Sequence, residues 1–235
     1  MKKILHLGKD RGHANFGWLD SHHSFSFGNY YHPEKVQFGA LRVLNDDIVD
    51  AGMGFGTHPH DNMEIISIPL SGELAHKDST GTNGVIQTGE VQIMSAGSGI
   101  RHSEFNHSQN DKVNFLQIWI LPKARNITPR YEQKAFAKEG KLNSFQTVVS
   151  PSDTNAVWIN QDAYFSIAVL ESGKELEYKL KNQNHGLYVF LIDGKLNIED
   201  QILEKRDAVG IWETDRIGFK AETESEFLVI EVPMQ

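Results

Sequence analysis

The chain has 235 residues, a formal net charge of −8 and 39% hydrophobic residues. Its length and apolar content suit one large or two small domains with buried cores, and aromatic residues spread along the whole chain exclude general disorder. The acidic balance argues against a nucleic-acid partner, and the absence of cysteine excludes disulfides, thiol nucleophiles, iron–sulfur clusters and cysteine-bound zinc.

The amino terminus and the apolar runs indicate a soluble chain. The first residues resemble the start of a secretory signal, but His6 and Lys9 end the apolar stretch too early. The longest apolar run, 115–121, contains Gln117 and is too short to cross a bilayer. We therefore expect a soluble, cytoplasmic protein with no membrane partner.

Short apolar or alternating runs, separated by Gly, Asn and Asp, predict β-strands along the whole chain. In chain order they cover residues 38–44, 64–70, 91–94, 114–121, 164–170, 187–192, 209–212 and 226–232. Helical periodicity is scarce. Many short, closely spaced strands favour an all-β sandwich or barrel fold.

A weak internal repeat divides the chain. A strand that ends at Gly72 and a similar strand that ends at Gly194 are each followed by a hairpin. The stretch between the repeats, about 122–153, is locally basic. Its basic residues are Lys123, Arg125, Arg130, Lys134, Lys138 and Lys141. We interpret it as a solvated connector that leads into a second, similar barrel, and less readily as a basic face for an acidic partner.

Two segments with a His-x-His or His-x-Glu pattern predict a metal site. His58 and His60 lie two residues apart in an extended segment, so both imidazoles can point to one side; His102 and Glu104 have the same spacing. Three imidazoles and one carboxylate on facing strands suit Fe(II), Mn, Ni, Cu or Zn, and leave positions for a substrate and O2.

The surroundings of these histidines favour a metal site over solvated or packed histidines. Glycines precede His58, Glu64 follows His60 by four residues, and the segment 89–97 leads to His102. Both segments are close to the two signature motifs of the cupin superfamily.

More specifically, the first 130 residues resemble the pirin family, in its bacterial two-barrel form. The similar segments are 18–28, 39–47, 54–60, 71–79, 89–104 and 117–122. The resemblance implies an all-β fold of two cupin (jelly-roll) barrels in tandem. It implies an N-terminal metal-binding domain over residues 1–125 and a C-terminal cupin domain over residues 126–235 that lacks metal ligands.

By motif position, the resemblance implies one divalent transition metal held by His58, His60, His102 and Glu104. Fe(II) is the favoured ion, and Ni, Mn, Co, Cu or Zn are alternatives. In cupins generally the glutamate of the first motif, here Glu64, is a ligand. The fourth ligand is therefore open between the two glutamates; we favour Glu104 and expect Glu64 to lie nearby and orient a ligand.

In the second half of the chain no ligand set is found. Leu180 and Asn182 stand where the histidine pair would be, and Phe219 is aligned opposite His102. His185 is expected at the surface or in a turn. We expect this second barrel to be structural, or to form a wall for partners.

The remaining histidines of the first half are expected to be structural. His22 and His23 lie in an aromatic segment and are expected to pack or cap. His76 and Asp78 fall on the hairpin after the first repeat, where a polar network is the simplest interpretation and a place at the mouth of the site is the alternative.

Some pirin-like proteins are flavonol 2,4-dioxygenases (quercetinases, or quercetin 2,3-dioxygenases). The resemblance thus implies a metal-dependent enzyme that opens the flavonol ring with O2 and releases carbon monoxide. Glu104 is the candidate catalytic base for the flavonol 3-hydroxyl, in a pocket expected near Phe55, Met63 and Met94. The alternatives are a non-catalytic, redox-sensing metal protein that binds a protein partner, or an enzyme for another small aromatic substrate. A monomer is the default oligomeric state.

Overall fold

The computed structural model describes residues 1–234 and consists of 22 strands arranged in four sheets. Within those residues the helical elements are two short 3-10 turns, Gly8–Asp10 and Lys138–Lys141. The prediction of an all-β chain is confirmed. Neither helical turn of the described chain has the length and apolar character that a membrane-spanning helix needs.

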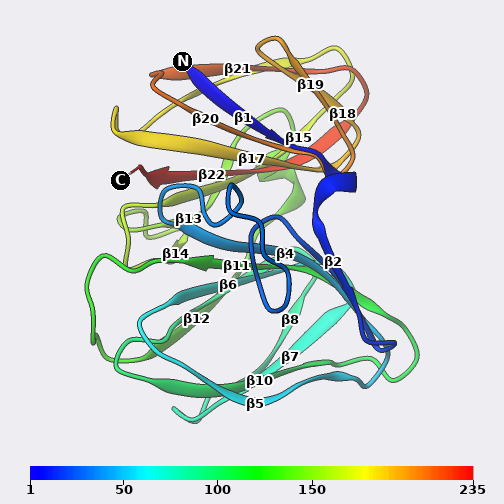
Figure 1. Ribbon diagram of the computed structural model, residues 1–235, viewed down its shortest axis with the longest axis vertical. Helices are drawn as coiled ribbons and strands as arrows, with labels where there is room; N and C mark the ends of the chain where they lie inside the picture. The colour runs from blue at the N-terminus through cyan, green and yellow to red at the C-terminus, as the bar shows by residue number, and fades with distance from the viewer. Residues whose placement is uncertain (235) are drawn as a thin grey trace.

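The four sheets form four layers (Figure 1). In the first barrel, a seven-stranded sheet in the order β12-β9-β6-β11-β4-β3-β2 faces a four-stranded sheet in the order β5-β10-β7-β8. The strands are β2 Gly12–Asn15, β3 Leu19–His23, β4 Leu41–Val49, β5 Gly54–His60, β6 Glu64–Ser71, β7 Glu73–Asp78, β8 Asn83–Gln87, β9 Glu90–Ser95, β10 Ile100–Asn106, β11 Val113–Ile120 and β12 Arg130–Ala135.

The second barrel repeats this plan. Its sheets have the orders β1-β20-β17-β22-β15-β13-β14 and β16-β21-β18-β19, so the internal repeat in the sequence is a repeat in the structure. The strands are β1 Lys2–His6, β13 Gln146–Ser150, β14 Val157–Trp158, β15 Tyr164–Leu170, β16 Glu175–Lys179, β17 His185–Asp193, β18 Lys195–Ile198, β19 Gln201–Glu204, β20 Ala208–Trp212, β21 Arg216–Ala221 and β22 Ser225–Pro233.

The two barrels exchange strands. β1, at the start of the chain, pairs with β20 in the second barrel, and β12 pairs with β9 in the first. Each of these strands therefore lies in the sheet of the other predicted domain. The division into domains 1–125 and 126–235 stays a prediction about folding units.

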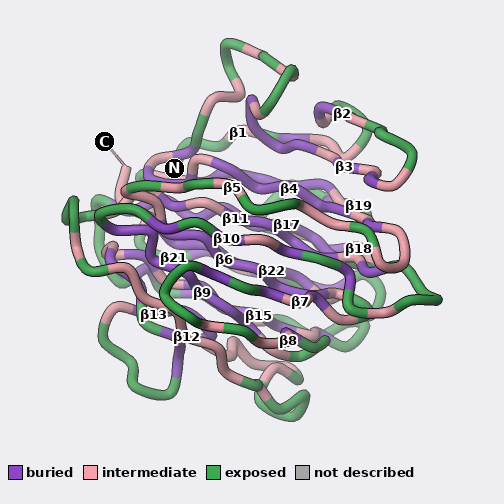
Figure 2. Tube along the Cα trace, turned by 90° about the horizontal axis from the view of Figure 1, so that it is seen from below, coloured by how far each residue is buried: buried purple, intermediate pink, exposed green. Residues whose placement is uncertain are grey.

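The largest apolar cluster lies between the two seven-stranded sheets. It joins Leu44 and Ile118 of the first barrel to Phe165, Tyr188 and Ile230 of the second. In Figure 2 the buried strands run through the middle of the molecule, and exposed segments lie at its rim. Because burial of apolar surface is the main stabilising term, this shared core holds the barrels together.

The interiors of the two barrels differ in chemistry. One apolar cluster, which includes Leu187, Val209 and Phe227, fills the second barrel. The first barrel contains two small apolar clusters, one around Phe115 and one around Ile65. The rest of the interior of the first barrel is not filled by these apolar clusters and can hold polar side chains.

Ile198 on β18 and His76 on β7 each lie four residues after the repeated glycine, Gly194 and Gly72. Ile198 pairs with Phe219 of β21, and His76 pairs with Glu104 of β10. Phe219 therefore corresponds to Glu104, and Ile217, two residues before it, corresponds to His102. The prediction that aligned Phe219 with His102 itself was wrong by one inward-facing position.

A buried polar network ties the second barrel together. His185 is 4% exposed, so of its two predicted places the surface was wrong; its backbone N–H bonds to the Asn182 carbonyl oxygen at 3.1 Å and closes a turn, the other place predicted for it. Its Nδ1 lies 2.8 Å from Oε1 of the fully buried Glu231. Glu231 also accepts hydrogen bonds from the Tyr178 hydroxyl at 3.0 Å and from the backbone N–H groups of Lys181 and Asn182. The network fastens the segment between β16 and β17 to β22.

Replacing Glu231 by alanine is expected to lower the free energy of unfolding by about 3–5 kcal/mol, because several buried donors lose their acceptor. Urea unfolding measures this loss. Glu226→Ala, on the same strand and partly exposed, is the matched control and should cost less than about 1 kcal/mol. Metal content per folded molecule should not change. Equal losses for the two variants would contradict this role of Glu231.

Candidate metal centre

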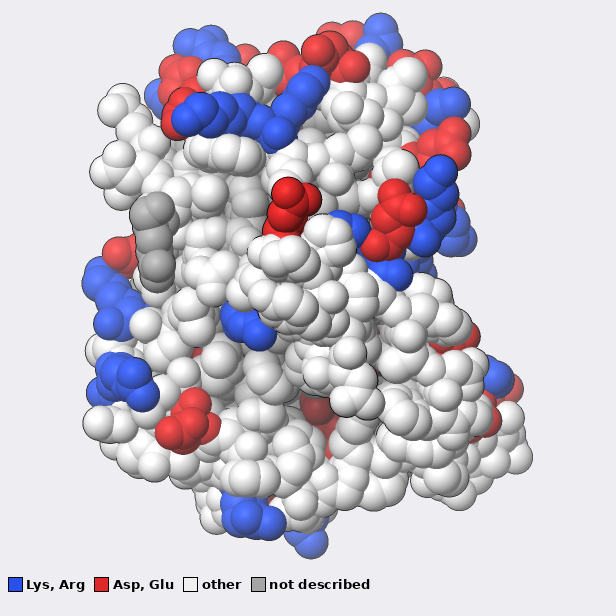
Figure 3. Space-filling model, viewed as in Figure 1, with Lys and Arg blue, Asp and Glu red and all other residues white. Residues whose placement is uncertain are grey.

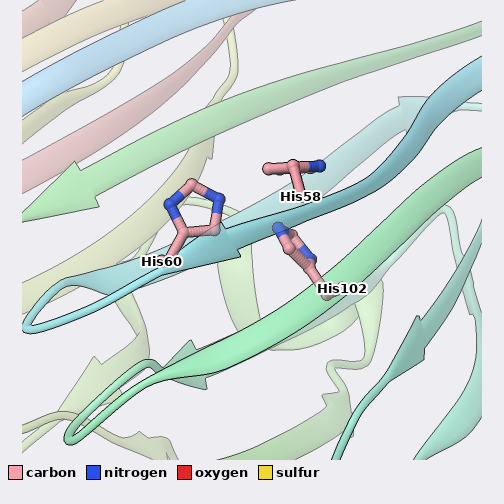
Figure 4. A group of neighbouring side chains, drawn as sticks. All are labelled: His58, His60 and His102. Atoms are coloured by element: carbon pink, nitrogen blue, oxygen red, sulfur yellow. The ribbon is translucent and has the colours of Figure 1, made fainter.

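Three imidazoles converge inside the first barrel. His58 and His60 come from β5 and His102 comes from β10 (Figure 4). One ring nitrogen from each lies within 4.8 Å of the other two. The ring centroids are 4.4 Å apart for His58 and His102 and 4.9 Å apart for His60 and His102. The three predicted imidazoles are thus close enough for one ion.

Local backbone geometry produces this convergence. The antiparallel register places His58 directly opposite His102, and the extended strand puts His60 on the same side. Between His102 and Glu104 the register with β5 shifts, which marks a bulge. At Gly54 a Cβ atom would lie 2.3 Å from the Glu104 carbonyl oxygen, so the close approach of β5 to β10 requires glycine there.

The protonation of these rings suits metal binding. His58 Nδ1 lies 2.8 Å from the carbonyl oxygen of Gly56 and donates there, so Nε2 is the nitrogen that can bind a metal. Burial, reinforced by neighbouring imidazoles, lowers the pKa of His60 to about 4 and that of His102 to about 3. Both nitrogens of His102 are buried without a hydrogen-bond partner among residues 1–234. A neutral imidazole without hydrogen-bond partners, such as that of His102, fits a divalent transition metal.

Glu104 lies beside this group and is 2% exposed. Its Oε1 accepts a hydrogen bond from Ser67 Oγ at 2.9 Å, and its Oε2 accepts one from Gln117 Nε2 at 2.7 Å. With His76 and His102 it forms a second, overlapping group of ligand atoms within 4.8 Å. The structure brings Glu104 next to one of the three imidazoles, and its part as fourth ligand stays a prediction.

Glu64, the other candidate for the fourth ligand, has different partners. It is fully buried, and its Oε2 accepts hydrogen bonds from Ser95 Oγ at 2.7 Å and from the backbone N–H of Asn160 at 3.1 Å. None of the groups of neighbouring ligand atoms in the described chain includes it. Its hydrogen bonds connect the first barrel to the segment between β14 and β15.

Burial raises the pKa of Glu64 from 4.5 to about 7. The folded protein keeps a proton that the unfolded chain loses, so this contribution to stability is complete below the unfolded pKa and is lost as the pH rises through about 7. We expect the free energy of unfolding of metal-free protein to fall by up to about 3 kcal/mol through this group. Urea unfolding across this pH range should show a shallower decline for Glu64→Gln. If the free energy of unfolding depends on pH identically in wild-type protein and in Glu64→Gln, the raised pKa of Glu64 is contradicted.

A cavity of about 480 Å³ opens beside the imidazoles. His58, Glu104 and Trp119 line it, together with residues of β2, of β3 and of the segment 27–30. Of the three apolar residues predicted around the pocket, Phe55 is confirmed as part of its wall. The prediction was wrong for Met63 and Met94, which pack in the small cluster around Ile65 instead.

A row of buried polar side chains crosses the inner face of the seven-stranded sheet, and sequence analysis did not identify it. On five neighbouring strands the row is His23, Asn45, Gln117, Ser67 and Gln92. The matching row of the second barrel contains Ser166 in place of Asn45, and valine (Val229, Val189 and Val209) in place of Gln117, Ser67 and Gln92. The sequence signal that could have revealed this row is a polar residue within an apolar strand, such as Gln117 in the run 115–121.

Two other histidine clusters lie near the site. His76 Nε2 is 2.9 Å from Asp78 Oδ2, and both side chains are buried, which confirms the predicted polar hairpin network. His13, Asp20 and His22 gather on the partly exposed β2–β3 hairpin. In the same hairpin, the ring of His23 packs against Phe27 and Tyr30, as predicted for an aromatic segment.

Known proteins resemble this chain along its whole length. Residues 6–120 match the Pirin family model, and residues 147–232 match the quercetinase C-terminal cupin domain. The chain is 41% identical to a protein of Escherichia coli K12 named quercetin 2,3-dioxygenase, over 97% of this chain and 98% of that protein. It is 37% identical to a pirin-like protein of Caulobacter vibrioides, over 94% and 95% of the two chains.

A crystal structure of the bacterial pirin YhhW from Escherichia coli in complex with nickel(II) has the same fold. It matches with a TM-score of 0.94 at 39% identity and covers 100% of both chains. The predicted arrangement of two tandem cupin domains is therefore confirmed. This two-barrel chain, with its histidine cluster in the first barrel, belongs to the pirin family.

Proposed function

We propose that this chain is a metal-dependent flavonol dioxygenase of the quercetinase type. It would open the flavonol ring with O2, form a depside and release carbon monoxide. The observation that carries the proposal is the group of three imidazoles beside a buried carboxylate, of which His58 and Glu104 line a cavity with several aromatic walls. The relatives named quercetin 2,3-dioxygenase support it.

In this proposal His58, His60, His102 and Glu104 hold one divalent ion. When bound, such an ion would supply Lewis acidity, and a redox-active ion such as Fe(II) would also supply one-electron chemistry for the reaction with O2. The nickel(II) complex of the related pirin supports a transition metal, and we favour Fe(II) over Ni, Mn, Co, Cu and Zn on the family resemblance.

Glu104 is our candidate for the base that takes the proton of the flavonol 3-hydroxyl. Its carboxylate borders the cavity, and donors from Ser67 and Gln117 fix its orientation. These two hydrogen bonds leave acceptor capacity on both oxygens for a substrate hydroxyl.

Aromatic side chains supply a wall for a flat ligand. Trp119 and Phe27 lie edge to face with ring centroids 5.4 Å apart, and Phe55 contacts Trp18 at the same separation. Trp119, Phe27 and Phe55 all line the cavity. Such walls exclude water and contact the faces of a fused ring system.

The rival proposal, a redox-sensing regulator with a protein partner, gains no support from the basic stretch between the barrels. Most of its charges have acidic partners: Lys123 with Asp162, Arg130 and Lys134 with Glu132, and Lys141 with Glu226. In Figure 3, basic and acidic side chains alternate over the second barrel, and much of the first barrel is uncharged. This face offers no basic surface for an acidic partner.

The test is reconstitution of metal-free protein under nitrogen with Fe(II), Ni, Mn, Co, Cu or Zn, followed by quercetin and air. We expect flavonol absorbance and dissolved O2 to fall together with at least one of the metals, and not with metal-free protein. Protein that holds one equivalent of each metal and consumes no flavonol would contradict the proposal and favour a regulator or another substrate.

A further inference from the structure

A second polar site faces the cavity, and the reaction proposed above does not use it. It consists of Asp47 on β4 and Ser21 and His23 on β3, all three lining the cavity and at most 4% exposed. Ser21 Oγ donates a hydrogen bond to Asp47 Oδ1 and lies 2.8 Å from His23 Nε2. The hydroxyl can give its single proton only once, so His23 donates to Ser21 and Ser21 donates to Asp47.

This chain of hydrogen bonds leaves one oxygen of Asp47 unused. Oδ1 receives the Ser21 hydroxyl, whereas Oδ2 has no hydrogen-bond partner among residues 1–234. Oδ2 is not among the fully buried unpaired side-chain atoms, and Asp47 lines the cavity, so a donor in the cavity can reach this oxygen. Burial also raises the pKa of Asp47 to about 7, so near neutral pH the group can accept or donate a hydrogen bond.

The fold does not need a carboxyl group at this position. Asp47 lies opposite Phe115 in the pairing of β4 with β11, and Ala168 lies opposite Phe227 in the matching pair of the second barrel. The second barrel forms the same strand pairing with a methyl group there. A purely structural role for Asp47 is therefore the weaker explanation.

Strand pairing indicates how far Asp47 lies from Gln117, the residue that holds Glu104. Asn45 pairs with Gln117, which holds Glu104, and Asp47 lies two residues further along the same face of β4. Standard strand geometry puts Asp47 and Gln117 about 8 Å apart between Cα atoms. Asp47 and Glu104 thus line the same cavity at two places, together with the polar Asn45 and Gln117 and the apolar Leu19 and Phe55.

We propose that Asp47, supported by Ser21 and His23, binds a second hydroxyl group of the substrate. The inference rests on the proposed function and narrows its substrate class to flavonols with a further hydroxyl several ångströms from the reacting one. A site built to bond a hydroxyl discriminates strongly against an analogue that lacks it, because its buried polar groups are then left unpaired.

The experiment compares two ligands on metal-loaded protein. Quercetin carries hydroxyls on both outer rings, whereas 3-hydroxyflavone keeps only the reacting hydroxyl. Dissociation constants are measured under nitrogen by quenching of tryptophan fluorescence, since Trp119 lines the cavity. We expect wild-type protein to bind quercetin at least about 10-fold more tightly, the lower end of such discrimination. Equal binding of both ligands would overturn the inference without any variant.

The variant is Asp47→Asn, which keeps the shape of the side chain. It should reduce the preference for quercetin to below about threefold, mainly by raising the dissociation constant of quercetin. The matched control is Asp50→Asn, just after β4, where the carboxylate pairs with Lys112 at the surface; it should keep the wild-type preference. An unchanged preference in Asp47→Asn, or an equal loss of affinity for both ligands, would overturn the inference.

Failure of the subsite and failure of the proposed function give different results. Selective binding of quercetin without turnover in air would contradict the dioxygenase and support the subsite. Turnover of both flavonols with equal affinity would support the dioxygenase and overturn the subsite. If metal-loaded wild-type protein binds neither flavonol, both are overturned.

Discussion

Replacing His102 by alanine is expected to abolish metal retention and to reduce flavonol turnover to the level of metal-free protein. His102 lies at the centre of the site, opposite His58 and near His60, and also belongs to the group that contains Glu104. Loss of outer-shell partners alone lowers metal affinity about 10–100-fold, so loss of a ligand should cost more. Metal analysis after dialysis and turnover of quercetin measure both effects.

Thermal unfolding distinguishes the loss of a metal ligand in His102→Ala from a general loss of stability. Because neither nitrogen of His102 bonds to the protein, the metal-free variant loses packing but no hydrogen bond. The rise in melting temperature that metal gives to wild-type protein should disappear in the variant. His107→Ala, at an exposed position just after β10, should behave as wild type. A His102→Ala protein that retains one equivalent of metal and wild-type turnover would contradict the assignment.

Glu104→Gln is expected to slow flavonol turnover by about 10²–10⁴-fold, the usual contribution of a general base. It should also weaken metal binding, because we propose this carboxylate as the fourth ligand. The amide has the same volume as the carboxyl group, so the losses of turnover and of metal affinity should come from the missing negative charge and the missing site for a proton. Steady-state kinetics and metal titration measure the two effects.

Glu64→Gln is the matched control for that substitution. It changes the other candidate carboxylate, which bonds to Ser95 and Asn160 and lies in none of the ligand groups. We expect it to retain metal and turnover. Loss of metal from Glu64→Gln with full retention by Glu104→Gln would reverse the assignment of the fourth ligand.

The fold was predictable because its signal is local. Alternating and continuous apolar runs predicted the strands, and the repeated strand-and-glycine pattern around Gly72 and Gly194 predicted two similar barrels. The exchange of β1 and β12 between the barrels was not predictable, since pairing between strands far apart in sequence leaves no local pattern. The burial of His185 depends on Glu231 of another strand and was missed for the same reason.

The histidine cluster was predictable from strand parity, because His58 and His60 must share a side and His102 lies in the second motif. The site formed by Ser21, His23 and Asp47 was not. Its residues come from two strands and face the cavity only in the register that the structure shows. The wrong placement of Met63 and Met94 has the same origin: proximity to a ligand in sequence does not determine which side chains face it.

The most direct test of the account is the amount of carbon monoxide released per flavonol consumed. Protein loaded with one equivalent of metal under nitrogen is mixed with quercetin and then exposed to air. If the proposed function is correct, one carbon monoxide is released for each flavonol lost, in proportion to bound metal, and both signals are strongly slowed in Glu104→Gln. Flavonol loss without carbon monoxide, or no loss from protein that demonstrably holds metal, would contradict it.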